Sequence, residues 1–314
     1  MNKTVNNISV GIPTFNSAKF IKNTIESILF NSYSVNEIII SDDNSEDETL
    51  VICQKLQTRD KSIKIYRNKH NFGYQKNWNK CFKYCKSKYL IILHHDDILK
   101  QNAIEKQIKF LNEHPDIALV GGQEDYIDEN GIITLEREKI KDKIFNKGNI
   151  FEFIKETGSY IPCSSVMFDM EKIRKIGFFD ENYLAADELF WPKVLTKFPI
   201  AVLGYSLIDR RNHSKQTEYS DFEKKSDKII EAAYAQNKIA EYEKEPLRQK
   251  ATLKILNEKT ARNCIRIAHK VFQRHRDIST ALKYLKVSFK EYPKIFFSKF
   301  FIKFTIKAVL GKIH

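Results

Sequence analysis

The sequence has 314 residues, of which 42% are hydrophobic and 12% aromatic, so the chain is long enough to bury a substantial core. Its first residues lack the charged region, apolar block and small-residue cleavage site of a signal peptide. No run of about 18 uninterrupted apolar residues predicts a transmembrane helix. Composition therefore excludes a small disulfide scaffold and favours a cytoplasmic protein with one or two domains.

The net charge of +13 is not spread evenly along the chain. Residues 1–210 hold 29 Lys and Arg against 29 Asp and Glu, whereas residues 211–314 hold 24 against 11. Such an asymmetry points to an anionic partner for the last third only, either a membrane surface or nucleic acid.

The five cysteines are odd in number, and their spacing matches neither a zinc site nor a disulfide framework. We expect all five to be reduced thiols, mostly in the core of a cytoplasmic protein. They are Cys53, Cys81, Cys85, Cys163 and Cys264.

Apolar runs alternate with helical patterns in the first half of the chain. Helices are predicted between these runs, and Asn16 or Ser17 could cap the first, while Ser45 and Glu48 have the spacing of a capping box for the second. Bare Ile, Val and Leu runs separated by helices predict a parallel sheet that is covered on both faces. The predicted strands are residues 8–15, 36–43, 62–68, 88–93 and 116–123.

From about residue 222 the pattern becomes helical and basic. Two helices are predicted at roughly 224–243 and 246–272, and a third after residue 277. We therefore expect a catalytic or binding domain over residues 1–220 and a basic helical region over residues 221–314.

Polar clusters follow three of the predicted strands, at residues 14–16, 42–44 and 94–97. Ligands of open parallel sheets bind at the carboxyl ends of the strands, where these clusters fall. The adjacent carboxylates Asp96 and Asp97 repel each other unless a cation lies beside them. A solvated loop and a metal site are the two interpretations of this stretch, and three clusters at one edge favour a site.

Three stretches together resemble the inverting nucleotide-sugar glycosyltransferases of family 2, which have the GT-A fold. They are "VGIPTFNSAKFIKNTIESIL", "NEIIISDDNSEDET" and "LHHDDIL", and the resemblance covers roughly residues 7–216. It implies a Rossmann-like mixed, mainly parallel sheet with helices on both faces. It also implies transfer of a sugar from a nucleotide diphosphate sugar, with UDP as the expected nucleotide.

The resemblance implies a donor site in the loops after the first two strands. Pro13, Thr14 and Phe15 would hold the base and ribose together with Asp43. An aromatic ring can stack on uracil and a carboxylate can accept its imide N–H, which suits this set. The plainer interpretation of Phe15 is a core residue at a strand end.

The family's metal motif is an aspartate, any residue and a second aspartate, and this chain departs from it. Asp96 holds the second position and is the implied ligand, with Asp97 as a weaker candidate. His94 holds the first position, as a contact to the ribose or the metal. A carboxylate beside a diphosphate suits Mg²⁺ or Mn²⁺, and a nearby imidazole favours Mn²⁺.

The family's catalytic base is an aspartate at the start of a helix, and "FFDENYLAADELFWPKVL" matches that layout. Asp187 would take the proton from the acceptor hydroxyl, with Glu188 as the rival one position on. Both could instead be acids favoured in a helix's first turn.

A closing motif of arginine, any residue, histidine and a later glutamine completes the resemblance. Arg211 would bind the donor diphosphate, His213 the metal, and Gln216 is a weaker candidate. Ser164 and Ser165 fall where the family has a strand on the acceptor side, and are also weak candidates.

The last residues, 292–314, alternate large apolar side chains with lysines. Lys299, Lys303 and Lys307 are spaced four apart and would form one stripe of a helix. This pattern favours a helix lying in an anionic membrane interface. A helix packed on the catalytic domain is the alternative, and nothing supports a nucleic-acid partner.

The sequence as a whole predicts an inverting, divalent-metal-dependent glycosyltransferase on the inner face of the plasma membrane. Its acceptor would be a lipid-linked glycan or a surface polysaccharide precursor. The alternatives are a nucleotidyltransferase and a non-catalytic nucleotide-sugar binding protein on the same fold. A nucleotidyltransferase should carry a Gly-rich basic loop near residues 13–16, where this chain has Pro-Thr-Phe-Asn.

Overall fold

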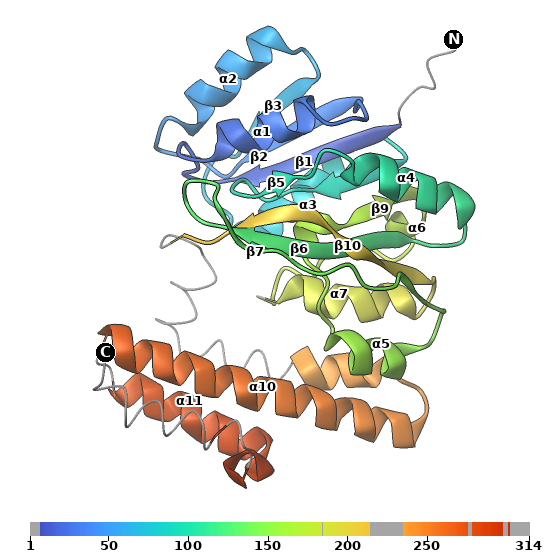
Figure 1. The fold of residues 1–314 in the computed structure, drawn as a ribbon, viewed down its shortest axis with the longest axis vertical. Helices are drawn as coiled ribbons and strands as arrows, with labels where there is room; N and C mark the ends of the chain where they lie inside the picture. The colour runs from blue at the N-terminus through green and yellow to red at the C-terminus, as the bar shows by residue number, and fades with distance from the viewer. Residues whose placement is uncertain (1–6, 184, 214–234, 276–277, 298–300, 302–314) are drawn as a thin grey trace. The chain divides into compact units, whose positions relative to one another are not determined.

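The computed structural model describes residues 7–183, 185–213, 235–275, 278–297 and 301 (Figure 1). Contacts between Cα atoms divide the chain into two compact units. The first comprises residues 1–149, 160–181 and 186–213, and the second comprises 150–159, 182–185 and 214–314. The domain boundary near residue 220 stays a prediction.

A single mixed sheet forms the centre of the first unit. Its strand order is β3-β2-β1-β4-β9-β6-β10-β5, with β7 paired to β6 and β8 to β10. Strands β1, β2, β3 and β4 are parallel, β9 runs against both β4 and β6, and β10 is parallel to β6. All the longer strands therefore point the same way, and the α/β fold expected from the sequence is confirmed. The strands are β1 (Ile8–Thr14), β2 (Glu37–Asp42), β3 (Ile63–Arg67), β4 (Tyr89–Ile92), β5 (Ile98–Leu99), β6 (Leu119–Ile127), β7 (Ile133–Leu135), β8 (Lys143–Phe145), β9 (Met167–Asp169) and β10 (Ile200–Arg211).

Helices cover both faces of this sheet. Successive residues of β1 point to opposite sides of the sheet, so their contacts identify the helix on each face. Val10 belongs to the buried core that includes Ile25 of α1, on one face. Gly11 faces the other side, where a Cβ on it would lie only 2.7 Å from the Cβ of Cys81 in α3. The helices of this unit are α1 (Ile21–Leu29), α2 (Thr49–Arg59), α3 (Tyr74–Tyr84), α4 (Ala103–Glu113), α6 (Met170–Arg174) and α7 (Ala186–Leu195).

Both helix-capping predictions are wrong. Helix α1 begins at Ile21 and α2 at Thr49, and neither has a side-chain hydrogen bond at its N-cap. The side chains of Asn16 and Ser45 instead accept hydrogen bonds from the main chain of the opposite loop. The Asn16 N–H donates to Ser45 Oγ at 2.9 Å, and the Glu46 N–H donates to Asn16 Oδ1 at 2.9 Å. Tertiary hydrogen bonds between the loops after β1 and β2 thus replace the local caps.

An aromatic cluster fixes the position of α7. The Phe168 ring of β9 lies 6.0 Å from the Trp191 ring, and Phe179 lies 4.9 Å from Phe190. Phe190 and Trp191 are almost fully buried. Where the resemblance implied an acceptor-side strand at Ser164 and Ser165, Cys163–Ser165 form a 3-10 helix instead, and β9 begins only at Met167.

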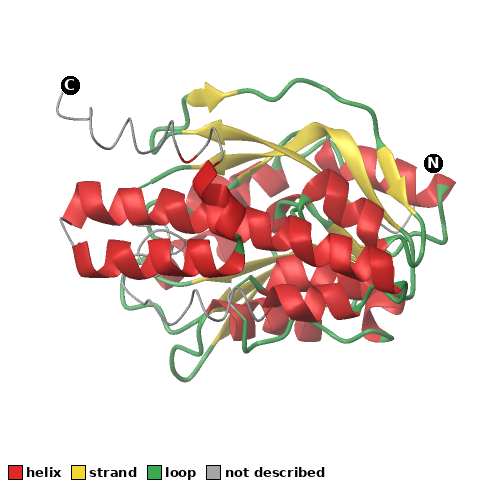
Figure 2. Ribbon diagram, turned by 90° about the horizontal axis from the view of Figure 1, so that it is seen from below, coloured by secondary structure: helices red, strands yellow, loops and turns green. Residues whose placement is uncertain are grey.

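The second unit is helical and contains α5 (Ile150–Thr157), α10 (Pro246–His275), α11 (Ile278–Glu291) and the 3-10 helix η2 (Pro293–Phe297). Helices α10 and α11 lie side by side (Figure 2), with the Ser288 hydroxyl donating to the Ala261 carbonyl at 3.0 Å. The predicted helices at 246–272 and after 277 are confirmed. Of the predicted helix at 224–243, the part up to residue 234 lies outside the described residues, and 235–241 is helical.

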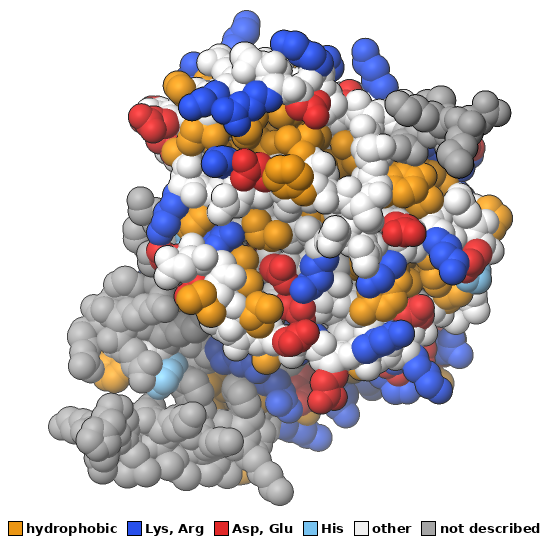
Figure 3. All heavy atoms as spheres, turned by 45° about the horizontal axis from the view of Figure 1, so that its top comes forward, with side chains coloured by type: hydrophobic (Ala, Val, Ile, Leu, Met, Phe, Trp, Pro, Cys, Tyr) orange, Lys and Arg blue, Asp and Glu red, His pale blue; other side chains and the backbone are white. Residues whose placement is uncertain are grey.

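All five cysteines are buried and free, as expected. No helix among the described residues is long and apolar enough to cross a membrane. On the face drawn in Figure 3, acidic and basic side chains of the first unit are interspersed, in keeping with the balanced charge of residues 1–210.

Candidate active site

Parallel pairing brings the three polar clusters to one edge of the sheet. Thr14 lies opposite Asp42 at the ends of β1 and β2, and the Asp43 N–H donates to the Thr14 carbonyl at 2.8 Å. On the other side of β1, the Leu93 N–H donates to the Gly11 carbonyl at 2.9 Å and leads β4 into residues 94–97. The carboxyl ends of three neighbouring strands therefore surround one location.

Asp43 organises a loop that sequence reasoning missed. Its buried carboxylate accepts hydrogen bonds from Asn68 Nδ2 at 2.6 Å, the Phe72 N–H at 3.0 Å and the Gly73 N–H at 2.9 Å. These contacts fasten residues 68–73 against the end of β2. The role of Asp43 at a bound base stays a prediction, and the structure adds Phe72 and Asn68 as neighbours of that position.

Of the other predicted donor residues, Phe15 alone offers a large exposed surface. Its side chain is 41% exposed, whereas Pro13 and Thr14 are buried within β1. The Thr14 hydroxyl is in hydrogen-bond contact with the Ser17 hydroxyl. A ring exposed at the carboxyl end of β1 is placed where a planar base can stack on it.

Asp96 and His213 form the centre of the site. His213 Nε2 lies 2.9 Å from Asp96 Oδ2, and both side chains are nearly buried. Burial alone would raise the pKa of Asp96, but the nearby His95 charge and the His213 hydrogen bond hold it well below its usual value. An ionised carboxylate beside an imidazole is a donor set that suits Mn²⁺.

A protein-only metal cage is absent from the part of the chain that the structure describes. No group of three or more His, Cys, Asp and Glu side chains there has a metal-binding arrangement. Asp96 and His213 would thus supply two ligands and leave the remaining positions to diphosphate oxygens and water, as Mg²⁺ and Mn²⁺ commonly do at phosphates.

Arg211 is buried and holds main-chain groups. Its guanidinium donates to the Asp96 carbonyl at 3.0 Å and to the Asp128 carbonyl at 3.0 Å. It also lies over the Phe20 ring, 4.9 Å from the centroid. These contacts fix the loop that carries Asp96, while the predicted contact of Arg211 with the diphosphate stays a prediction.

Asp97 is buried beneath this centre. Burial and the Asp96 charge raise the pKa of Asp97 well above its usual value. The Arg211 N–H donates to Asp97 Oδ1 at 3.2 Å, which ties the β4 loop to the end of β10.

His94 stacks on an aromatic ring that sequence analysis did not select. The Trp78 and His94 ring centroids are 5.0 Å apart at an interplanar angle of 16°. Burial lowers the pKa of His94 to about 4, so the imidazole is neutral at pH 7. Its Nε2 is buried and has no hydrogen-bond partner among the described residues. A neutral ring with one nitrogen unpaired can accept or donate one hydrogen bond to a ligand.

Asp187 and Glu188 occupy the first turn of α7, and both are partly exposed. Burial raises the pKa of the Cys163 thiol, and the charges of Asp187 and Asp97 raise it further. Cys163 is the neighbour of Ser164, which accepts the His94 N–H at 3.1 Å, so the thiol on which the Asp187 charge acts lies beside the β4 loop. The assignment of Asp187 as the base, with Glu188 as its rival, stays a prediction.

The two serine candidates differ in their surroundings. Ser164 Oγ accepts a hydrogen bond from the His94 N–H at 3.1 Å, beside the site. The Ser165 hydroxyl donates to the Pro162 carbonyl at 2.7 Å and lies 3.1 Å from the Gly122 carbonyl. Its oxygen accepts from the Gly122 N–H at 3.1 Å, so the contacts of Ser165 are structural. Gln216 lies outside the described residues.

Comparison with known proteins places this geometry in a class of enzymes, the glycosyltransferases. The sequence model of glycosyl transferase family 2 matches residues 9–177. A glycosyltransferase of Methanocaldococcus jannaschii is 31% identical over 227 residues, which are 68% of this chain and 76% of that protein. One of Haemophilus influenzae is 27% identical over 242 residues, 74% of this chain and 75% of that protein. The chain belongs to glycosyl transferase family 2.

Other relatives are longer than this chain. A glycosyltransferase of Rickettsia felis is 32% identical over 212 residues, and the match spans 67% of this chain but only 35% of that protein.

Solved structures confirm the fold. Residues 1–349 of S. aureus TarS superpose with a TM-score of 0.56 at 18% identity, covering 91% of each chain. The same protein in complex with UDP-GlcNAc gives the same TM-score, identity and coverage. At this identity the likeness concerns the fold, which is of the GT-A type.

Proposed function

We propose that this glycosyltransferase moves a sugar from a UDP-sugar to a hydroxyl of a glycan acceptor, with inversion at the anomeric carbon and with a divalent metal ion. The observation that carries the proposal is the ionised Asp96 held against His213, 2.9 Å away, where the end of β10 meets the loop after β4. Family membership supports the reaction class, and the UDP-GlcNAc complex of the similarly folded TarS supports the choice of nucleotide.

The chain's own residues divide the work. Phe15 and Asp43 hold the base, and Asp96 with His213 would hold a divalent ion, which when bound neutralises charge on the leaving diphosphate. Asp187 takes the proton from the acceptor hydroxyl while the hydroxyl oxygen of the acceptor attacks the anomeric carbon from the face opposite the diphosphate. That attack breaks the bond to the diphosphate oxygen and inverts the configuration.

A thermal-shift screen of nucleotides and nucleotide sugars tests the donor class. We expect UDP and at least one UDP-sugar to raise the midpoint of unfolding with Mn²⁺ present, and to lose most of that effect with a chelator. Equal stabilisation by every nucleotide with and without the metal would contradict the proposed site.

We also propose that the acceptor is lipid-linked and that the basic C-terminal segment binds the cytoplasmic face of the plasma membrane. Residues 211–314 carry the whole excess of positive charge. In η2 the Phe297 side chain is 84% exposed and Phe296 is 51% exposed. Exposed phenylalanines next to a lysine-rich sequence are suited to an anionic interface. Lys299, Lys303 and Lys307 lie outside the described residues.

A chain that ends at Tyr292 should no longer float with anionic vesicles. Each lysine near an anionic surface contributes about 1 kcal/mol, and the apolar side chains add to this. The truncated chain should keep its hydrolytic activity on the donor and lose efficient transfer to a lipid-linked acceptor.

Vesicle composition provides the control for that truncation. Binding of the full chain should weaken in high salt or with purely zwitterionic vesicles. A flotation assay in which both chains float equally would assign the segment to packing on the protein.

A further inference from the structure

Three polar side chains on β6 and β10, together with Tyr160 from the loop before Cys163, form a cluster that neither the donor residues nor the catalytic base accounts for. Glu124 Oε1 accepts hydrogen bonds from the hydroxyls of Tyr126, at 2.6 Å, and Tyr160, at 2.8 Å. Arg210 Nη1 lies 3.4 Å from the same oxygen and donates to the Tyr160 hydroxyl at 2.9 Å. One carboxylate oxygen is therefore held by three neighbours.

The other oxygen of Glu124 is unused. Glu124 is 4% exposed, and its Oε2 is buried without a hydrogen-bond partner among the described residues. Leaving a carboxylate oxygen buried and unpaired is costly, so native structures normally pair it with protein, water or ligand. Tyr160 is 37% exposed and lies at the rim of the cluster, so a ligand could approach from that side.

The cluster lies beside the candidate active site. Arg210 directly precedes Arg211 in β10, and the Arg211 N–H donates to Asp97 Oδ1 of the β4 loop at 3.2 Å. Strand β6 runs parallel to β4, with β9 between them. The cluster is thus on the side of β4 that is away from the nucleotide loops of β1 and β2.

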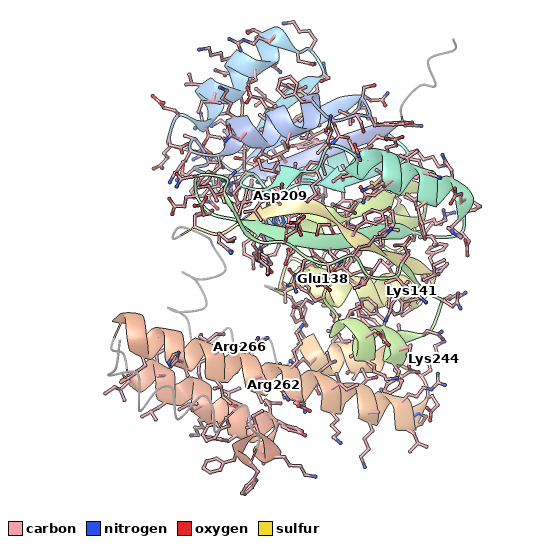
Figure 4. The ribbon with its side chains drawn as sticks, in the orientation of Figure 1. Glu138, Lys141, Asp209, Lys244, Arg262 and Arg266 are labelled. Carbon is pink, nitrogen blue, oxygen red and sulfur yellow. The ribbon has the colours of Figure 1, made fainter. Side chains whose placement is uncertain are left out.

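The opposite face of the same two strands shows what a purely structural arrangement looks like here. Asp125 alternates with Glu124 on β6, and Asp209, labelled in Figure 4, alternates with Arg210 on β10. Both aspartates form ion pairs with Lys100, at 2.8 and 2.7 Å. That network links β6, β10 and the residue after β5. The Glu124 face differs because Glu124 Oε2 is buried without a hydrogen-bond partner among the described residues and the neighbouring Tyr160 is 37% exposed.

We propose that Glu124, positioned by Tyr126, Tyr160 and Arg210, binds the hydroxyl groups of a pyranose ring in the active site. A carboxylate can accept hydrogen bonds from two neighbouring sugar hydroxyls, and charged acceptors make the stronger bonds. The inference rests on the proposed sugar transfer and names a specificity residue for it. The pyranose is either the donor sugar or the acceptor's terminal sugar.

Glu124→Gln tests the inference because it keeps the shape of the side chain and removes its charge. We expect kcat/KM for transfer to fall about 10- to 100-fold, the loss typical of a charged hydrogen bond, while calorimetric affinity for UDP alone is unchanged. A raised KM for UDP-sugar in the hydrolysis assay would identify the donor sugar. A raised KM for the acceptor alone would identify the acceptor.

Two further variants make the result interpretable. Asp125→Asn, on the opposite face, should leave both KM values unchanged and controls for general weakening of the strands. Tyr160→Phe removes only the hydroxyl that joins Glu124 to Arg210 and should give a smaller effect of the same kind, even if Glu124→Gln folds poorly. Kinetics at the wild-type level in both cluster variants would overturn the inference.

Failure of the proposed function can be told apart from failure of this inference. If the wild-type chain neither binds nor cleaves any UDP-sugar, the proposed function fails. Saturation-transfer NMR with methyl pyranosides then tests the cluster directly. Signal in the wild-type chain that is lost in Glu124→Gln supports the sugar site, and equal signal in both, or none in either, overturns it.

Discussion

Replacing Asp187 by asparagine should reduce sugar transfer by about 10²-fold or more while leaving the affinity for the donor nearly unchanged. Asparagine keeps the size of the side chain at the start of α7 and cannot accept the acceptor's proton. The start of α7 is anchored by the aromatic cluster of Phe168, Phe190 and Trp191, so we expect the variant to fold normally. The measurement is initial velocity with saturating donor, with UDP affinity determined in parallel by calorimetry.

Glu188→Gln is the matched control, because Glu188 occupies the next position of the same helical turn. It should retain most of the activity if Asp187 is the base. The reverse result, an inactive Glu188→Gln beside an active Asp187→Asn, would move the base by one residue. Equal and modest losses of transfer activity in the two variants would indicate that Asp187 and Glu188 are simply acidic residues favoured at a helix N-terminus.

Replacing Asp96 by alanine should abolish the metal-dependent part of UDP binding. Asp96 is held ionised next to His213, and its removal takes away the one carboxylate that this pair offers to a cation. Calorimetric titration of UDP with Mn²⁺ present should give the affinity that the wild-type chain shows with a chelator. The midpoint of unfolding without ligand checks that the fold is retained.

His213→Ala separates ligation from a general disturbance of the loop. It removes the second side chain of the pair and leaves Asp96 with Arg211 at its carbonyl, so metal-dependent binding should weaken less than in Asp96→Ala. Unchanged UDP affinity in Asp96→Ala would remove this residue from the site and would leave the β4 loop without a metal role.

Much of the fold follows from patterns that are local in the sequence. Bare apolar runs predicted the strands around Val10, Ile39 and Ile91, because parallel strands covered on both faces are mostly apolar along their length. After residue 246, apolar residues spaced three to four apart predicted α10 and α11. The caps at Asn16 and Ser45 were not predictable in this way, because these side chains bind across the loops after β1 and β2.

The candidate site likewise has features that local sequence patterns predict and features that depend on tertiary contacts. Because parallel strands end at one edge, the sequence could place Thr14, Asp43 and Asp96 together. The sequence could not show that Asn68 and the Phe72 N–H donate hydrogen bonds to the Asp43 carboxylate, because these partners are 25 and 29 residues away along the chain. Glu124 left only a weak signal in the sequence, because it stands between the polar residues Gln123 and Asp125, and its partners Tyr160 and Arg210 are apparent only in three dimensions.

Release of UDP from a UDP-sugar by the full chain is the most direct test of the central claim, metal-dependent transfer from a nucleotide sugar. We expect UDP to form with Mn²⁺ present, faster when a glycan acceptor is added, and to fall to background with a chelator or in Asp96→Ala. Binding of UDP-sugars without any release of UDP, across a panel of sugars and acceptors, would contradict the account and indicate a non-catalytic nucleotide-sugar binding protein on this fold.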